Sequence, residues 1–464
     1  MADDGFGFGS AAPIADDESS PSSPIAPIDV PPASQARAEL LHSPTPRRRA
    51  FLARLTPAAL ACYNLTDALT LLGVLTRVPE GEPVGRALVA ADEERAPEDR
   101  LGVLEHAVNW LAHEAGKASA PGDALVLLGW VCTLWDLVLA RGTTPTSSPL
   151  LPTHLTTAAA LLSTVLASGK PGAKHGAITR VRRAMRNAKD TLPDTIDALV
   201  TLASAKPAPG KPASDPTTIL PLLGVAVGVT LRLKPTPGTI SEAQKAALTT
   251  LYTTLALPSR TPLPPYVLDA FDDWAAHLLN ETDLDKLADA ADKALMRAPE
   301  GAAVALTGLV KTYTHPASIP TNDPAPSRRQ LPITFIDKLL PAVVNLARGV
   351  GAAHAGDLVA ALVEGSSSGE ADSSTDIATT TLTQLLALPK AGKTAGADHR
   401  AALYAMVGRV VGAGEGSEPA LFALQTGLPL IAKETHDAPL NALTAALRAA
   451  LMVVLRVPAH RSLT

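Results

Sequence analysis

The chain has few cysteines and few aromatic residues, and each scarcity excludes a class of protein. Its two cysteines, Cys62 and Cys132, lie far apart and have no CxxC spacing. A disulfide framework is therefore excluded, and we expect both thiols to be free and buried in a reducing compartment. Aromatic residues make up 3% of the chain. Because strands favour aromatic and β-branched residues, extensive β-sheet is disfavoured.

Long apolar runs and a strong net charge are also missing. The longest apolar run, from Ala124 to Ala140, contains Asp136 and is shorter than the roughly 20 apolar residues of a membrane-spanning helix. The N-terminus lacks the basic start and apolar core of a secretory signal. The formal net charge is −5, which provides no whole-molecule attraction to nucleic acid or membranes. These features predict a cytoplasmic protein with no membrane partner.

The chain is rich in residues that favour closely packed helices. Hydrophobic residues, mostly alanine and leucine, make up 46% of the chain. The pattern is clearest in a hairpin from Asp283 to Tyr313, whose first helix has apolar residues at i, i+3, i+4 and i+7. Thr282 is a good N-cap for this helix. The helix should end at Ala298, because Pro299 disfavours helical geometry in the residue before it and suits the first turn of a second helix.

Such a hairpin cannot bury both apolar faces alone, so similar hairpins must stack against it. Its first face comprises Leu284, Leu287, Ala288, Ala291, Leu295 and Ala298, and its second comprises Ala302, Leu306, Leu309, Val310 and Tyr313. Further helix pairs recur about every 46 residues, the period of HEAT or armadillo units. Their expected starts are Pro97, Pro152, Leu192, Ser241, Thr282, Leu331, Thr375 and Ser417, and Ser241 with Gln244 suits a capping box. The expected fold is all-α, an α-solenoid of HEAT/armadillo-like helical hairpins.

Composition divides the chain into three regions. Residues 1–46 are rich in Pro, Ser and Asp and are predicted to form a disordered tail. Residues 47–457 are predicted to form the solenoid as one continuous array. Residues 458–464 follow the last strong helix, Pro439–Val457, without a polar capping unit. This pattern predicts a truncated end with exposed apolar side chains after Leu455.

No catalytic motif is complete. The tripeptide GKT at 392–394 suggests a phosphate-binding loop, but GxxxxGK[ST] requires glycine where Ala387 stands and a strand where residues 379–388 have a helical pattern. His106, His113 and the other histidines lack metal-binding spacings. The adjacent carboxylates Asp272 and Asp273 point to different sides of a helix and are expected at the surface. We therefore expect no enzyme activity and no cofactor or metal.

One segment, from Lys170 to Lys189, is basic and contains no acidic residue. On a helix, Arg182, Arg186 and Lys189 share a face, with Arg183 beside them. Such a cluster could follow a phosphate backbone, whereas the lack of interleaved aromatic residues argues against base stacking. The alternative is an ordinary solvated basic face. The candidate contacts to ribosomal RNA are Lys174, Arg180, Arg182, Arg183, Arg186 and Lys189.

Three stretches of the second half occur in a recognisable order. They are KALMRAPEGAAVALTGLV from Lys293, LALPKAGKTAGADHRAALYAMV from Leu386 and GLPLIAKETHDAPLNALTAAL from Gly427. Together they resemble the N-terminal HEAT-repeat region of the general control nonderepressible-one family, very large ribosome-associated activators of the amino-acid-starvation kinase. The chain departs from that pattern at Gly301 and Ala302, where larger aliphatic residues are usual.

The resemblance implies a non-catalytic scaffold in a translational activator. Its expected partners are the ribosome, through ribosomal RNA and ribosomal proteins, and, indirectly, the starvation-kinase pathway that phosphorylates initiation factor two alpha. The family's kinase-binding segment lies further along than this chain reaches, so no residue here is expected to bind the kinase. The alternative is an importin-like HEAT-repeat scaffold that binds transport cargo or other proteins.

Overall fold

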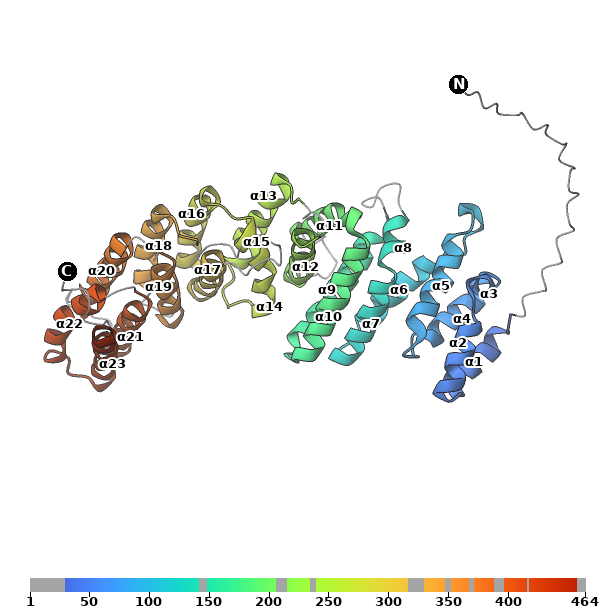
Figure 1. Ribbon diagram of the computed structural model, residues 1–464, viewed down its shortest axis with the longest axis horizontal. Helices are drawn as coiled ribbons and strands as arrows, with labels where there is room; N and C mark the ends of the chain where they lie inside the picture. The colour runs from blue at the N-terminus through green and yellow to red at the C-terminus, as the bar shows by residue number, and fades with distance from the viewer. Residues whose placement is uncertain are drawn as a thin grey trace, which may run out of the picture. The chain divides into compact units, whose positions relative to one another are not determined.

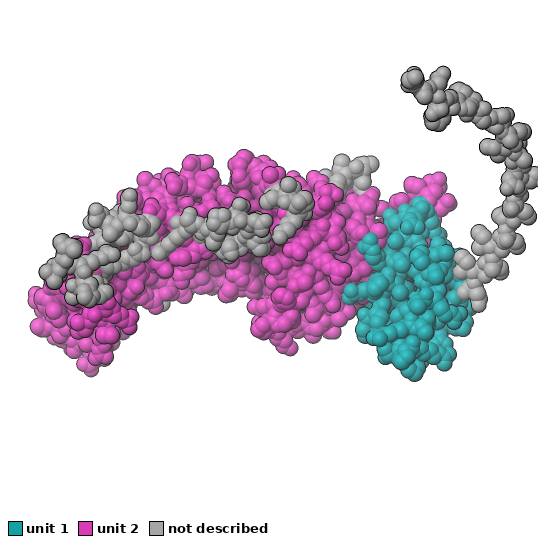
Figure 2. Space-filling model, in the orientation of Figure 1, with its two compact units in different colours: residues 1–95 teal, residues 96–464 magenta. Residues whose placement is uncertain are grey.

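The computed structural model describes residues 30–141, 148–205, 215–233, 239–315, 329–346, 352–366, 371–387, 396–414 and 417–456. Within these ranges the regular secondary structure is helical and contains no strand, so the all-α prediction is confirmed. The chain divides into two compact units, residues 1–95 and 96–464 (Figure 2). Residues 392–394, 458–464 and the first part of the expected tail, 1–29, lie outside the described residues.

Unit 1 is a small helical bundle. It contains α1 (Ala33–His42), α2 (Thr45–Arg54), α3 (Pro57–Ala61), α4 (Leu65–Leu75) and α5 (Gly81–Glu93). Helix α1 packs against α4, and α3 packs against α5. The short α3 begins at a proline, and the hydroxyl of Thr56 caps it by accepting a hydrogen bond from the Ala59 amide at 3.3 Å.

The expected boundary of the disordered tail at residue 46 is wrong, because α1 is a packed helix within it. Ala33, Ala36 and Leu40 are all buried, and they recur at i, i+3 and i+7 on one helical face. The hydroxyl of Tyr63 also donates a hydrogen bond to the Pro31 carbonyl at 2.9 Å. The polar composition of residues 1–46 led to the prediction of disorder. The short apolar face of α1 is buried against α4, which lies more than 20 residues further along the chain.

Unit 2 contains the longer series of helices (Figure 1). They are η1 (Pro97–Asp99), α6 (Val103–Ala115), α7 (Pro121–Thr133), α8 (Trp135–Ala140), α9 (Leu151–Ala167), α10 (Pro171–Asn187), η3 (Lys189–Thr191), α11 (Leu192–Ser204), η4 (Pro216–Thr218), α12 (Leu220–Leu231), α13 (Glu242–Leu251), the π-helical η5 (Tyr252–Ala256), α14 (Pro265–Leu268), η6 (Asp269–Phe271), α15 (Asp272–His277), α16 (Glu281–Arg297), α17 (Pro299–Thr314), α18 (Ile333–Leu346), α19 (Ala352–Ser366), α20 (Ala371–Ala387), α21 (Ala397–Ala413), α22 (Glu418–Ile431) and α23 (Asp437–Arg456). Most helix pairs begin within a few residues of the expected starts.

The helices of unit 2 stack in two layers, as expected of an α-solenoid. In the first layer α11 contacts α13, and α16, α18, α20 and α22 contact one another in sequence. In the second layer the contacts run from α10 through α12, α15, α17, α19 and α21 to α23. Successive hairpins up to α23 thus bury one another's apolar faces, which explains why the repeat must stack.

The hairpin of α16 and α17 has the expected form, apart from its cap. Every residue of the two predicted faces is buried, and α17 begins at Pro299 directly after the C-cap Ala298. The N-cap of α16, however, is Asn280 rather than Thr282: the Asn280 side chain accepts a hydrogen bond from the Asp283 amide at 2.9 Å. Asparagine and threonine both cap well, so propensity could not choose between them. The predicted capping box of Ser241 and Gln244 is confirmed.

The expectation of buried thiols is wrong. Cys62, the C-cap residue of α3, is exposed and Cys132 of α7 is half-buried. At the other end of the described chain, Leu451, Met452 and Leu455 of α23 are 47%, 47% and 69% exposed. Helix α23 is long and apolar enough to cross a membrane by length and composition alone.

Candidate functional site

Helix α10 carries the basic residues that the sequence nominates. Pro171 occupies its first turn, and Ala177, Val181, Ala184 and Met185 form its buried face. At 3.6 residues per turn, the intervening arginines are directed away from that face. Arg182, Arg183 and Arg186 are exposed, and none of them forms a salt bridge within the described part of the chain. We call these three residues the α10 ridge.

The six candidate residues do not form one stripe. Arg180 lies on the flank that faces α7, where its Nη1 donates a hydrogen bond to the Leu125 carbonyl at 3.3 Å. Lys174 is near the opposite flank, because it acts electrostatically on Asp269 of η6. Lys189 is exposed in η3, beyond the end of α10. Arg182 and Arg186, one turn apart on α10, are close enough for their charges to interact, whereas the Arg180 side chain is directed toward α7.

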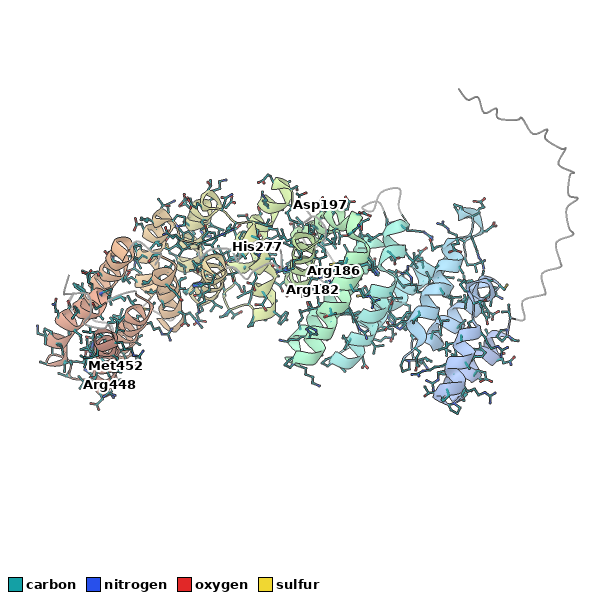
Figure 3. The ribbon with its side chains drawn as sticks, in the orientation of Figure 1. Arg182, Arg186, Asp197, His277, Arg448 and Met452 are labelled. Carbon is teal, nitrogen blue, oxygen red and sulfur yellow. The ribbon has the colours of Figure 1, made fainter. Side chains whose placement is uncertain are left out.

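Beside the α10 ridge lies a bidentate ion pair between α12 and α15. The Arg232 guanidinium donates from Nη1 to Asp273 Oδ2 at 2.8 Å and from Nη2 to Asp273 Oδ1 at 2.5 Å. Gly228 permits this approach, since a Cβ there would lie 2.2 Å from Asp273 Oδ2. Arg182 is exposed at the surface, but its guanidinium lies partly buried beside this ion pair, and that partial burial and then the charge of Arg232 lower the pKa of Arg182. Figure 3 shows Arg182, Arg186 and His277 in this central part of unit 2.

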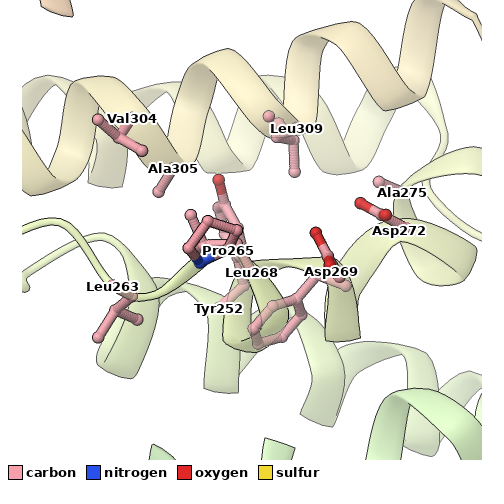
Figure 4. Close-up of a pocket in the computed structure, with 12 residues that line it drawn as sticks. Tyr252, Leu263, Pro265, Leu268, Asp269, Asp272, Ala275, Val304, Ala305 and Leu309 are labelled. Carbon is pink, nitrogen blue, oxygen red and sulfur yellow. The ribbon is translucent and has the colours of Figure 1, made fainter. Parts of the chain in front are cut away.

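The next part of the same layer is acidic and hollowed. Asp269 of η6 and Asp272 of α15 line a cavity of about 220 Å³ (Figure 4). Asp272 also lines a second cavity of about 230 Å³ together with His277, Lys311 and His315. Burial, and then the neighbouring charge of Asp269, raises the pKa of Asp272 to about 6. The carboxylates of Asp269 and Asp272 therefore follow the α10 ridge along the second layer.

Sequence reasoning missed this acidic cavity. The two neighbouring carboxylates do point apart, as expected, because Asp273 binds Arg232 while Asp272 faces the cavities. Asp272 is exposed, as expected, and Asp273 is half-buried; the sequence did not show that α12 and α17 supply their surroundings. The repeated prolines and acids of the segment 262–273 were the available signal, but its non-helical stretch could not be folded by periodicity alone.

No metal site emerges in the described ranges, where no group of three His, Cys, Asp or Glu side chains could hold a metal ion. His154 is buried against Trp135, with ring centroids 5.3 Å apart. Burial lowers the pKa of this histidine to about 4, so its ring is neutral at physiological pH. Residues 379–387 belong to helix α20, which supports the argument against a strand before the GKT tripeptide.

Two of the three family-like stretches are joined by an ion pair. Arg400 Nε donates to Glu434 Oε2 at 2.9 Å, and Arg400 Nη2 donates to Glu434 Oε1 at 2.8 Å. The side chains are 15% and 5% exposed. The arginine opens α21 and the glutamate follows α22, so this pair ties one hairpin to the next. It contributes to the architecture of the array and brings no reactive group to a cavity.

Comparisons with known proteins give the following similarities. No protein-family model matches the sequence, and no curated protein matches it. Solved structures of Kap121p do match: Kap121p bound to Nup53p has 13% sequence identity and a TM-score of 0.30, over 91% of this chain and 49% of that chain. The karyopherin Kap121p bound to the extreme C-terminus of the protein phosphatase Cdc14p has 13% identity and a TM-score of 0.30, over 91% and 50%. The chain spans about half the length of these structures, and a likeness at this level carries no inference about partners.

Proposed function

We propose that this chain is a non-catalytic scaffold that associates with ribosomes, as the N-terminal portion of a translational activator acting under amino-acid starvation. The observation that carries the proposal is the α10 ridge, whose three exposed arginines form no salt bridge within the described residues. Exposed cations of this kind bind phosphate oxygens and release condensed counterions. The choice of the ribosome among polyanions rests on the three family-like stretches.

The size of the ridge limits the strength of the contact. If Arg182, Arg183 and Arg186 each neutralise one phosphate, raising the salt concentration from 50 to 200 mM should weaken binding roughly fortyfold. If all six basic candidates reached phosphate, the loss would be on the order of a thousandfold. Because Arg180 hydrogen-bonds toward α7, Lys174 acts on Asp269 and Lys189 lies beyond the end of α10, we expect the smaller value.

The test is co-sedimentation of the full chain with purified ribosomes through a sucrose cushion at several salt concentrations. The variant Arg182→Glu/Arg183→Glu/Arg186→Glu should lose most of the co-sedimentation seen at low salt. A matched control is Lys286→Glu/Lys293→Glu/Arg297→Glu, which makes the same charge change at exposed positions of α16. Equal binding by the two variants would remove the ridge as the contact, and failure of the wild-type chain to sediment would overturn the proposal.

The second candidate function is an importin-like or other protein-binding scaffold, and the acidic cavity favours it. Asp269 and Asp272 would repel a phosphate backbone that continued from the ridge along the second layer. A protein partner with basic side chains would be attracted there instead. Affinity capture from cell extract, followed by mass spectrometry, would favour this function if it yields a small GTPase or basic cargo and no ribosomal proteins.

A further inference from the structure

One of the two cavities described above has an apolar wall, two carboxylates and a buried hydroxyl. It lies between α17 on one side and η5, α14, η6 and the start of α15 on the other (Figure 4). Its apolar lining includes Leu263, Leu268, Phe271, Val304 and Leu309. No basic side chain is among the described residues that line it. We call it the η6–α17 pocket.

The hydroxyl of Tyr252 is the first unusual feature of the pocket. The Tyr252 residue is 2% exposed, and its hydroxyl oxygen has no hydrogen-bond partner among the described residues. Its ring is held by Phe271 and Trp274, with centroids 5.2 Å and 5.3 Å away. A buried polar group without a partner costs free energy, so a ligand that hydrogen-bonds this hydroxyl would recover part of that cost.

The two carboxylates are the second feature. Asp269 and Asp272 point to the same part of the pocket (Figure 4). Neither forms a salt bridge within the described residues. The Asp272 Oδ1 atom accepts a hydrogen bond from Thr312 Oγ1 at 3.2 Å, which neutralises no charge. Lys174 acts on Asp269 from α10 without forming an ion pair. A cation placed between these carboxylates would relieve their mutual repulsion.

We propose that the η6–α17 pocket binds the side chain of a lysine residue presented by a partner protein. The apolar wall fits the four-carbon stem of lysine, and the charged end can remain beside the carboxylates near solvent. An ammonium group has three N–H donors and no acceptor. Asp269, Asp272 and the Tyr252 hydroxyl supply acceptors for them. A planar guanidinium instead favours a bidentate arrangement on one carboxylate.

The surroundings agree with a binding site rather than a packing defect. Gly308 of α17 lines the pocket, and a Cβ added there would meet no atom within 4 Å. The aromatic cluster beneath the pocket is tightly packed, as the short ring separations show. The space at Gly308 is therefore open while the floor of the pocket is closely packed, and a preorganised site reduces the entropy lost on binding. This proposal extends the protein-binding alternative and is independent of the α10 ridge.

The test uses the full chain and small probes, so it does not require the partner to be known. The probe is Nα-acetyl-lysine methylamide, and its binding is measured by ligand-observed NMR titration. Three relatives of the probe separate the contributions: the Nε-acetylated compound removes the charge, the norleucine analogue keeps only the stem, and the arginine analogue changes the charged group. We expect the lysine probe to bind at least about tenfold more tightly than each of the three.

Variants locate the binding. Asp269→Asn/Asp272→Asn should weaken binding of the lysine probe at least about tenfold, while Glu98→Gln/Asp99→Asn, the same charge change at exposed positions of η1, should leave it unchanged. Tyr252→Phe should weaken it by a smaller factor. Gly308→Leu fills the pocket without altering any charge and should abolish binding of the lysine probe. This variant tests the location of the binding site if Asp269→Asn/Asp272→Asn does not fold.

Several results would overturn the proposal. No saturable binding of the lysine probe to the wild-type chain would do so, as would equal binding of the neutral analogues. Tighter binding of the arginine analogue would overturn the choice of lysine. The ribosome proposal would survive each of these results, because it is tested with the α10 variants.

Discussion

The Arg400 guanidinium binds both carboxylate oxygens of Glu434, at 2.9 Å and 2.8 Å. The two residues lie in the stretches that begin at Leu386 and Gly427, and they meet where α21 and the end of α22 adjoin. Hydrogen bonds from Arg400 are the main reason that the pKa of Glu434 is lowered. The two side chains are nearly buried, so removing either one would leave the other charge without a partner in a poorly solvated place.

The Arg400–Glu434 pair predicts a loss of stability in acid. Because the folded pKa of Glu434 lies below its usual value of 4.5, the unfolded chain binds the proton more readily. The stabilisation is therefore present above pH 4.5 and is lost as the pH falls through the lowered pKa. Glu434→Gln should be less stable than the wild type at pH 7, and the difference should shrink below pH 4.5. Melting temperatures measured from pH 3 to 7 check this, and a constant difference would contradict it.

The buried histidine predicts a second and separate effect of pH. Burial lowers the pKa of His154 from 6.5 to about 4, so the folded state holds the neutral ring. The stability that this provides is present above pH 6.5 and is lost as the pH falls towards 4. His154→Phe keeps an aromatic ring against Trp135 and should flatten the change in melting temperature between pH 7 and pH 4.5. A variant as sensitive as the wild type over this range would show that His154 is not the cause.

The Arg232–Asp273 pair should matter more than a similar pair at the surface. Its side chains are 23% and 19% exposed, so Arg232→Ala leaves a partly buried carboxylate without its partner and should cost about 1–3 kcal/mol. Arg409 and Asp357 also form a salt bridge, but at 45% and 54% exposure, and Arg409→Ala should cost less than about 1 kcal/mol. Urea denaturation followed by circular dichroism compares them. An equal loss of unfolding free energy in the two variants would mean that burial does not determine how much the Arg232–Asp273 pair stabilises the protein.

Replacing two glycines of α17 by alanine should change the stability of the protein in opposite directions. A Cβ at Gly301 would lie 1.9 Å from the Ser259 carbonyl oxygen, so Gly301→Ala must displace backbone and should destabilise by about 1–3 kcal/mol. A Cβ at Gly308 would meet nothing within 4 Å, and Gly308→Ala should stabilise the helix by about 0.5–1 kcal/mol. Thermal melts of both variants and the wild type test the pair. Destabilisation by Gly308→Ala would contradict the open space seen at that position.

The departure at Gly301 from the family-like pattern has a structural reason. The sequence alone marks Gly301 as smaller than expected, and the structure shows that the Ser259 carbonyl occupies the place of a side chain. Similarly, Gly228 is unremarkable in the sequence, yet its missing side chain lets Asp273 reach Arg232. Close approaches of this kind join residues far apart in the chain, and local pattern cannot detect them.

The all-α class, the hairpin joint at Pro299 and the buried faces of α16 and α17 could be predicted from the sequence, because helical periodicity and proline geometry act within a few residues. It could not determine that α1 packs against α4, that Arg180 hydrogen-bonds toward α7, or that Asp269, Asp272 and Tyr252 line one pocket. Those relationships depend on the stacking of hairpins, which brings residues from different repeats together. They appear only in the folded array, since the burial and the electrostatic environment of a side chain are set by neighbours that lie far away in the sequence.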